Sequence, residues 1–240
     1  MHPAELRRFR PFATLASADL MGIASVARSC HYQHGARIFR AGDPCAGVIL
    51  VLDGFVRLSR CTSNGAEVVT GIVRPGCLAA VAALRGAATH DHDAEALGHV
   101  RAVEVPASPV LALVCHSSRL FEELARSLVA RADEAYADSV IDAHEHLPSR
   151  ILRTLRHLVR ELPAGRDAQS THPLAVRLSH AEVARLVGSD RASVTRALRL
   201  LEERRLIRRE RGHVTGVVLM PGGSPEGGTA PPVPETGRER

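Results

Sequence analysis

The sequence contains no lysine and no tryptophan, and aromatic residues make up only 3% of its 240 residues. So few aromatic rings argue against binding of single-stranded nucleic acid, which relies on stacking bases against such rings. The five cysteines are odd in number and form no C-x-x-C pair. This pattern argues against a disulfide scaffold and against a zinc ribbon.

Long apolar runs and common catalytic motifs are also missing. No uncharged apolar segment is long enough to cross a bilayer, and the N-terminal residues lack an apolar signal core. We therefore expect no membrane partner and a cytoplasmic location. The sequence has no G-x-S-x-G, no P-loop and no H-E-x-x-H, so we expect a binding protein rather than an enzyme.

The positive charge is concentrated in the last third of the chain. All 31 basic residues are arginine, and the net charge of the whole chain is +5. Residues 147–219 hold 15 Arg against seven Asp or Glu, a net charge of +8, which leaves −3 for the remainder. This asymmetry predicts a phosphate-binding module joined to a different kind of domain.

Residues 178–206 have the pattern of a helix-turn-helix. Ser179 and Glu182 match a capping box that starts one helix near His180, and Gly188 suits a tight turn after it. We expect Ser189 to cap the second helix. The apolar positions that should join the two helices recur at helical spacing: Val183, Leu186, Val187, Val194, Ala197, Leu198 and Leu201.

An ordinary amphipathic helix pair with a solvated arginine face would give the same pattern. The segment that follows favours a nucleic-acid-binding unit, because a basic stretch at 208–213 precedes an apolar run from Val214 to Leu219. Together they predict a two-stranded wing that turns at Gly212.

Between Cys30 and Pro106 the chain alternates short β-rich runs with glycines. The predicted strands are 36–39, 48–52, 55–59, 68–73 and 100–105. Asn64-Gly65 is a strong hairpin signal, and strands at such spacing favour a sandwich or a roll.

A long helical pattern then runs from residue 109 to about His146. One narrow stripe of it consists of Leu120, Leu124, Leu128, Ala132, Ala135 and Ser139. A stripe sustained over several turns favours packing against a parallel copy of the same helix, and the alternative is packing on the β-rich domain alone. Leu147-Pro148 is the expected hinge to the next helix.

Three segments together resemble the CRP/FNR superfamily of bacterial transcription regulators: 36–44 (ARIFRAGDP), 48–58 (VILVLDGFVRL) and 187–198 (VGSDRASVTRAL). The resemblance implies an α+β fold in which a cyclic-nucleotide-binding-like β-roll, a long dimerisation helix and a winged helix-turn-helix follow one another. The corresponding ranges are 1–116, 117–146 and 147–220, before a Pro/Gly-rich tail at 221–240 that we expect to be disordered. The implied partners are double-stranded DNA, a second copy of the chain and RNA polymerase.

The resemblance also assigns roles on the second helix. Arg191 and Arg196 occupy the positions of two base-reading arginines, each able to contact guanine O6 and N7. Ala192 stands where the family has an acid, so we expect a half-site that departs from the family's best-known TGTGA sequence, or less strict reading of that sequence. Ser193 lies beside Ala192 as a further base contact. The phosphate-contact candidates are Ser189, Thr195, Arg199, Arg208, Arg209 and Arg211.

The signal that the roll would sense stays open. In cyclic-AMP-responsive relatives a Gly-Glu pair and an Arg-Ser pair hold the ribose and the phosphate, and the aligned positions here are approximately Ala80-Val81 and Asp93-Ala94. Because the ribose carboxylate and the phosphate cation are both missing there, the sequence argues against cyclic AMP.

The resemblance to this family also bears on iron–sulfur clusters and haem. The first cysteine is Cys30, so the N-terminal cysteine cluster of iron–sulfur relatives is absent. Haem remains an alternative through His31 and His34 or through His90 and His92, although surface histidines are the simpler interpretation. The hypotheses left open are therefore a signal-switched dimeric regulator and an effector-independent DNA-binding protein with a degenerate roll.

Overall fold

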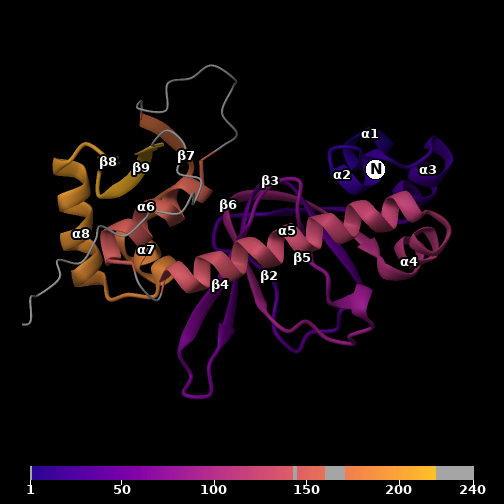
Figure 1. Ribbon diagram of the computed structural model, residues 1–240, viewed down its shortest axis with the longest axis horizontal. Helices are drawn as coiled ribbons and strands as arrows, with labels where there is room; N and C mark the ends of the chain where they lie inside the picture. Colours follow the sequence, from indigo (N-terminus) through magenta and orange to yellow (C-terminus); the bar gives the residue numbers. More distant parts are fainter. Residues whose placement is uncertain (1, 143–144, 160–170, 220–240) are drawn as a thin grey trace, which may run out of the picture.

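The computed structural model describes residues 2–142, 145–159 and 171–219. A β-roll with short N-terminal helices is joined by one long helix to a smaller C-terminal domain, which lies at one end of the molecule (Figure 1). Three short helices precede the roll: α1 (Pro3–Leu6), α2 (Arg10–Ala13) and α3 (Ser17–Val26). Their apolar side chains, including Phe9 and Phe12, are buried against the roll in one cluster with Leu50 and Val103.

The roll contains six strands and one short 3₁₀ helix. They are β1 (Arg28–Tyr32), β2 (Arg37–Phe39), β3 (Gly47–Cys61), β4 (Glu67–Val73), β5 (Leu78–Ala80), η1 (Ala82–Arg85) and β6 (Asp93–Pro106). The central pair is β3 and β6, which run antiparallel, with β4 next to β3 and β1 next to β6. The predicted hairpin is confirmed, because β3 and β4 pair on either side of Asn64-Gly65 and Gly65 has a φ of 81°.

The strand prediction was incomplete in two ways. The runs 48–52 and 55–59 belong to one strand, β3, whose register shifts near Asp53 rather than ending there. The strands β1 and β5 were not predicted. The strand β1 is mostly exposed and polar (RSCHY), and β5 has only three residues, so neither shows the apolar alternation by which strands are recognised.

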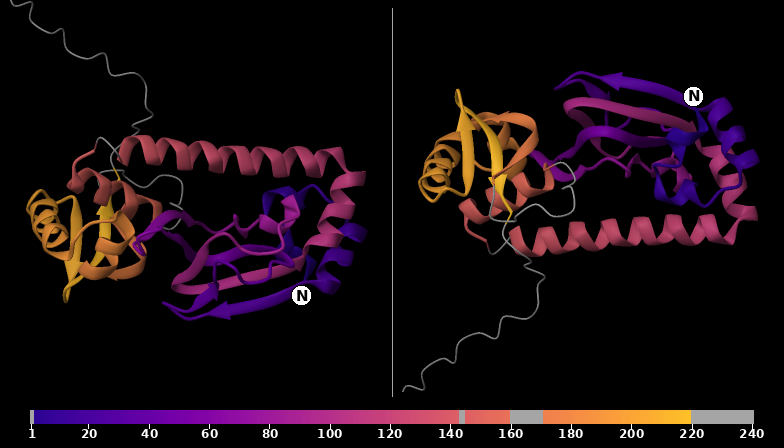
Figure 2. Two further views of the ribbon diagram at one scale, coloured as in Figure 1. Left: turned by 90° about the horizontal axis from the view of Figure 1, so that it is seen from below. Right: turned by 90° about the horizontal axis from the view of Figure 1, so that it is seen from above.

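The predicted long helix is two helices, α4 (Ala107–His116) and α5 (Ser118–Asp142), which meet at Ser117. Ser117 has extended backbone angles, φ −131° and ψ 96°, and its hydroxyl accepts a hydrogen bond from the N–H of Leu120. The serine therefore caps a new helix instead of continuing the old one. The helix α5 then runs along one side of the roll toward the C-terminal domain (Figure 2).

Burial corrects two of the residues predicted to face a second copy. Leu120 is fully buried and Leu124 is 6% exposed, both in the cluster that joins α5 to its own roll. Side chains enclosed in this way have no surface left for a partner, so this part of the prediction was wrong. Leu128 is half-buried, whereas Ala132 and Ala135 are exposed. The side chain of Ser139 lies outside the described residues.

The C-terminal domain consists of α6 (Leu147–His157), β7 (Thr171–Ser179), α7 (His180–Val187), α8 (Arg191–Glu203), β8 (Ile207–Glu210) and β9 (His213–Val218). The strands β8 and β9 form the predicted wing, and β7, which was not predicted, completes a three-stranded sheet in the order β7-β9-β8. The tail predicted to be disordered, 221–240, lies outside the described residues.

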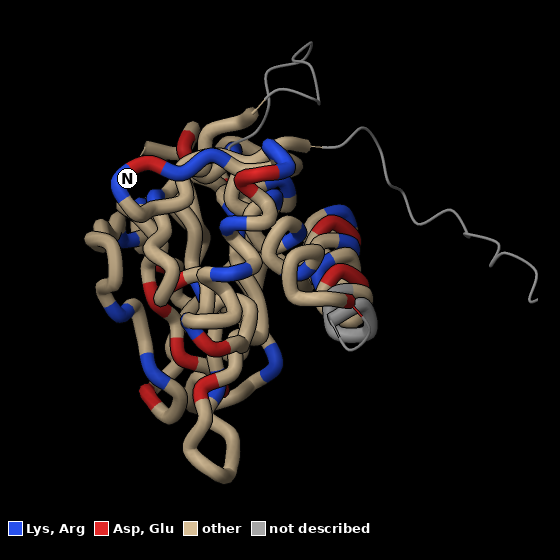
Figure 3. The backbone as a smooth tube through the Cα atoms, turned by 90° about the vertical axis from the view of Figure 1, so that its left-hand side faces the viewer, with Lys and Arg blue, Asp and Glu red and all other residues tan. Residues whose placement is uncertain are grey.

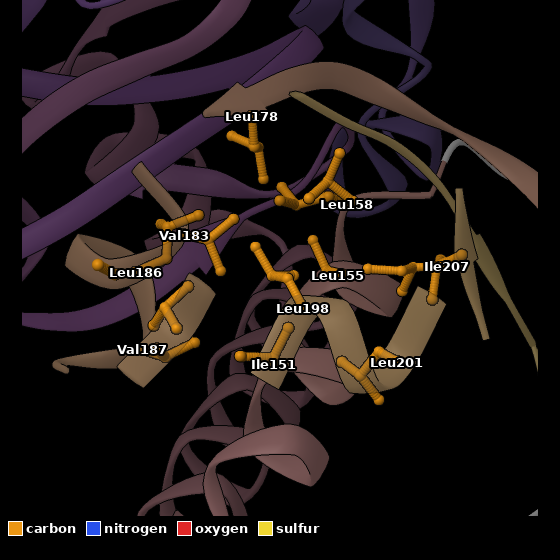
Figure 4. Close-up of a cluster of buried hydrophobic side chains, with 14 of the residues drawn as sticks. Ile151, Leu155, Leu158, Leu178, Val183, Leu186, Val187, Leu198, Leu201 and Ile207 are labelled. Carbon is orange, nitrogen blue, oxygen red and sulfur yellow. The ribbon is translucent and has the colours of Figure 1, made fainter. Parts of the chain in front are cut away.

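The core of this domain holds its three helices in fixed positions. Ile151 and Leu155 of α6 point toward Val183 of α7 and Leu198 of α8, and Ile207 closes the cluster from the wing (Figure 4). These five side chains are at most 5% exposed. The apolar spacing seen in the sequence thus forms one buried interface, which leaves the opposite side of α8 to solvent.

Candidate nucleic-acid interface

The first helix of the pair, α7, begins and ends as the sequence predicts. The N–H of Ser179 donates to Glu182 Oε2 at 2.7 Å, and the N–H of Glu182 donates to Ser179 Oγ at 3.3 Å, which completes the capping box. Gly188 ends the helix with a φ of 62°, the left-handed conformation that favours glycine.

The cap of α8 is Asp190, not Ser189. The side chain of Asp190 accepts a hydrogen bond of 2.8 Å from the N–H of Ser193. That bond holds the pKa of the Asp190 carboxyl below its ordinary value. Both residues can cap a helix, and the turn places the aspartate, one residue later, at the position where the backbone changes from extended to helical. Ser189 instead uses its N–H to bind the carbonyl of Ala184.

The predicted base-reading residues lie together on the exposed side of α8. Arg191, Ala192 and Arg196 are exposed, and Ser193 is half-buried, with its hydroxyl accepting a hydrogen bond of 2.9 Å from Arg196 Nη2. Figure 3 marks the arginines and the acidic residues along the backbone, viewed from the end that carries α8 and the wing. Contact of these side chains with DNA bases stays a prediction.

The predicted phosphate contacts divide into free and engaged side chains. Arg199 and Arg211 are exposed, whereas Arg208 is exposed but lies 3.5 Å from the carboxylate of Glu210. Arg209 is only 19% exposed and forms an ion pair with Glu202, which neutralises its charge. The Thr195 hydroxyl donates a hydrogen bond of 2.8 Å to the carbonyl of Arg191, so the structure offers no support for its predicted phosphate contact.

The wing projects a basic tip. Arg211 and Gly212 form the two-residue turn between β8 and β9, with φ of 48° and 78°. Positive φ at both positions matches the turn whose twist fits a two-stranded hairpin. Arg211 is therefore exposed in the turn itself, and Arg208 is exposed on the strand that leads into it.

Two family models match the chain. The model of the cyclic nucleotide-binding domain matches residues 29–116, and the model of the Crp-like helix-turn-helix domain matches residues 149–219. The chain belongs to the CRP/FNR family of transcription regulators. It is a DNA-binding regulator with a helix-turn-helix domain behind a cyclic-nucleotide-binding-type roll.

Individual relatives agree with this assignment. The global nitrogen regulator of Synechococcus elongatus is 27% identical over 77% of this chain and 83% of its own length. The cyclic AMP receptor protein of Thermus thermophilus is 28% identical over 74% of this chain and 78% of its own length.

Solved structures share the fold. A CRP/FNR-family transcriptional regulator of Thermus thermophilus superimposes with a TM-score of 0.62 and 28% identity, covering 79% of this chain and 93% of that chain. The c-di-GMP-responsive global regulator CLP of Xanthomonas campestris has a TM-score of 0.66 at 21% identity, covering 84% of this chain and 99% of that chain.

In this CRP/FNR regulator, a junction between the roll and α7 was not predicted from the sequence. Gly98 donates its N–H to His34 Nδ1 at 2.9 Å, so His34 carries its ring hydrogen on Nε2 and donates it to Glu182 at 2.6 Å. Arg185 of α7 lies 3.2 Å from Glu67 and 3.5 Å from Glu95 of the roll. Pairs so distant in sequence leave no spacing pattern.

The roll and α5 line an open cavity of about 300 Å³. Of the predicted effector residues, Ala80 and Val81 line it, but Asp93 and Ala94 do not. Asp93 forms an ion pair with Arg37, and Ala94 is fully buried in the sheet. The prediction for these two residues was wrong, because the alignment across the segment before β6 matched them to cavity positions that they do not occupy.

The charged and imidazole side chains that line the cavity come from three segments, η1, the loop before β6, and α5: Arg85, His90, Asp91, His92 and Arg131. His90 stacks on Phe39 with 3.8 Å between ring centroids, and burial lowers the pKa of its imidazole. Asp91 is engaged by Arg60, Arg85 and His92. The cavity therefore holds two arginines against one carboxylate, so the absence of a cation at Asp93-Ala94 does not leave it without positive charge.

The histidines considered as haem ligands have partners of their own. His34 and His92 bind Glu182 and Asp91, His90 stacks on Phe39, and the ring of His31 lies 6.2 Å from that of His99. Within the described ranges, no three His, Cys, Asp or Glu side chains are grouped to hold a metal ion, and no helix is both long and apolar enough to span a membrane.

Proposed function

We propose that the protein binds a pseudo-palindromic DNA operator as a homodimer, with Arg191 and Arg196 reading bases in the major groove. The observation that carries this proposal is the exposed face of α8. Among the described residues, no carboxylate lies within ion-pair distance of Arg191 or Arg196, in contrast to Arg209, which is neutralised by Glu202. Unpaired arginines on the open side of a rigidly packed helix are available to guanine edges.

Selection of bound sequences from random duplexes tests the proposal and supplies the operator. We expect two half-sites about one helical turn apart. Arg196→Ala should weaken binding to the selected operator by about 1–3 kcal/mol per lost base contact while changing binding to random duplex much less. Arg204→Ala is the matched control, because it removes the same charge at the far end of α8. Equal losses of Arg196→Ala on both duplexes would remove this residue from base readout.

The dimer contact that we propose lies on the exposed apolar side of α5. Phe121, Val129 and Tyr136 are 58%, 59% and 74% exposed, and their spacing of seven to eight residues places them on one face. This stripe is displaced by one residue from the stripe predicted from the sequence, because Leu120 and Leu124 are buried against the roll. An exposed apolar stripe on a long helix is the surface expected to pair with a second copy.

Light scattering after size exclusion tests this contact. Val129→Asp places a charge in the centre of the stripe and should convert the dimer to a monomer. Met21→Asp is the control, since Met21 of α3 is 57% exposed and lies outside the stripe. A dimer that survives Val129→Asp would place the contact elsewhere.

We further propose that residues 1–116 sense a small anionic molecule in the cationic cavity and that the DNA-bound dimer acts on RNA polymerase. Arg85 and Arg131 supply the positive charge, and Ala80 and Val81 line the wall beside them. Cyclic AMP remains a poor candidate, because the cavity carboxylate, Asp91, is already held by two arginines and a histidine and is not free for a ribose.

Calorimetric titration with cyclic AMP, cyclic GMP, inorganic phosphate and small carboxylates tests the cavity, and Arg131→Met is the matched variant. We expect binding of at least one anion that Arg131→Met weakens, together with a change in operator affinity. Operator binding that no anion alters would favour the effector-independent regulator instead.

A further inference from the structure

His180 occupies the first position of α7 and contacts both the wing and α8, the helix with the proposed base-reading arginines, called the recognition helix below. Its Nδ1 lies 3.0 Å from Thr195 Oγ1 of α8, and its Nε2 lies 3.3 Å from Arg209 Nη1 of β8. None of the contacts proposed above for DNA uses this residue. The sequence pattern treated it only as the position where a helix begins.

The directions of the hydrogen bonds are fixed by the chemistry of the partners. A guanidinium nitrogen can only donate, so Arg209 donates to Nε2, which must then carry no hydrogen. The ring hydrogen is therefore on Nδ1 and is donated to Thr195 Oγ1. The Thr195 hydroxyl in turn donates to the carbonyl of Arg191. One continuous relay runs from the wing through His180 and Thr195 to the first residue of α8.

We propose that neutral His180 is a positioning residue that sets the start of the recognition helix relative to the wing. The relay ends on the main chain of Arg191. Its effect on operator binding therefore rests on the base-reading role proposed above for this residue. The wing end is itself anchored, because Arg209 also pairs with Glu202 near the other end of α8. The wing is thus joined to both ends of the recognition helix.

Protonation of His180 breaks this arrangement. An imidazolium carries a hydrogen on both nitrogens. Its Nε2–H would then face the Arg209 guanidinium, which has no hydrogen-bond acceptor. Burial lowers the pKa of His180, and the surrounding cations lower it further. The charged and titratable groups around the ring belong to α8, β8 and β9: Arg191, Arg199, Glu202, Arg209 and His213.

The pH dependence follows from the sign of that shift. Because the pKa of His180 lies below the ordinary value of 6.5, its ring is neutral above pH 6.5 and becomes charged only as the pH falls through that lowered pKa. The relay is present at neutral pH and is lost as the pH falls through the lowered pKa. General attraction to phosphate changes in the opposite direction, because protonation adds positive charge. The ratio of operator binding to random-duplex binding therefore reports on the relay rather than on charge.

Two measurements on the full-length protein test the proposal. Nitrogen-15 NMR of the imidazole should show the hydrogen on Nδ1 at neutral pH. Thr195→Val, which keeps the shape of the side chain and removes the hydroxyl, should reduce the preference for the selected operator by about tenfold without changing the unfolding temperature appreciably. His180→Asn keeps a donor toward Thr195 but is too short for Arg209, so it should retain part of the preference and lose its dependence on pH.

His116→Asn is the matched control, because His116 lies in α4, is not among the groups around the His180 ring, and binds the carbonyl of Ala112 within its own helix. It should keep both the preference and its pH dependence. A hydrogen on Nε2, a charged ring at neutral pH, or equal losses on both duplexes in Thr195→Val would overturn the relay. A wild-type protein that prefers no duplex would instead count against the proposed base readout, and the NMR result alone would then decide the relay.

Discussion

On the side of α7 that faces α8, Val183 and Val187 are buried in the apolar core. On the side that faces the roll, Glu182 accepts a hydrogen bond from His34, and Arg185 forms an ion pair with Glu67. Arg185 is 48% exposed and its partner Glu67 is 36% exposed, so water competes for this contact. The roll's apolar share of the junction is smaller and consists of the buried Phe55 and Leu97 and the partly buried Ile72.

The interface of α7 with α8 and the interface of α7 with the roll therefore differ in how much they stabilise the protein. Buried apolar packing contributes stability in proportion to the area removed from water, whereas partly exposed ion pairs contribute little. We therefore expect α6, α7, α8 and the wing to move as one body when the contacts between the roll and α7 change. Three predictions test the contrast, and they follow in order of decreasing effect.

The largest effect should come from the core. Leu198 is fully buried in α8, and Leu198→Ala should lower the free energy of unfolding by about 2–5 kcal/mol through lost burial and a cavity. Denaturant unfolding of the full chain measures the change. Leu200→Ala on the same helix is the control, because Leu200 is 37% exposed. Similar losses from the two substitutions would contradict the packing described for α8.

An intermediate effect should come from the charged network behind the junction. Arg57 is 3% exposed and pairs with Glu95 at 2.7 Å and with Glu67 at 3.1 Å. Glu95→Ala removes the nearer partner of this buried cation and should cost about 1–3 kcal/mol of stability.

Arg185→Ala is the matched comparison for Glu95→Ala, since it leaves both partners of Arg57 in place and should cost at most about 1 kcal/mol. Hydrogen exchange should nevertheless increase where α7 meets the roll. An Arg185→Ala variant as destabilised as Glu95→Ala would mean that the junction itself holds the roll together.

The smallest effect should be acid opening of the junction. Burial raises the pKa of Glu182, but the hydrogen bonds from Ser179 and His34 outweigh it, so the pKa lies below its ordinary value of 4.5. A carboxyl with a lowered pKa contributes stability above pH 4.5 that is lost as the pH falls through the folded-state pKa. Small-angle scattering should show separation of the domains below pH 4.5, and His34→Ala should shift this opening to higher pH. Opening that does not respond to His34→Ala would exclude this pair.

Local patterns in the sequence were enough to predict the parts of the molecule that depend on local chemistry. The capping box at Ser179, the left-handed turn at Gly188 and the apolar spacing of α8 are fixed by residues within a few positions of each other, and each is present in the structure. The order of roll, long helix and winged helix-turn-helix followed from the resemblance of three segments to one family, and the family matches agree with it.

Which helix faces are covered, and which residues distant in sequence are in contact, became known from the tertiary structure. It assigned Leu120 and Leu124 to the roll, moved Asp93 and Ala94 away from the cavity, and brought His34 to Glu182 and His180 to Arg209. A helical stripe is apolar for the same reason whether a roll or a second copy covers it, so periodicity cannot distinguish the two. Contacts between residues far apart in the chain follow from packing of whole elements, and that packing is absent from any local pattern.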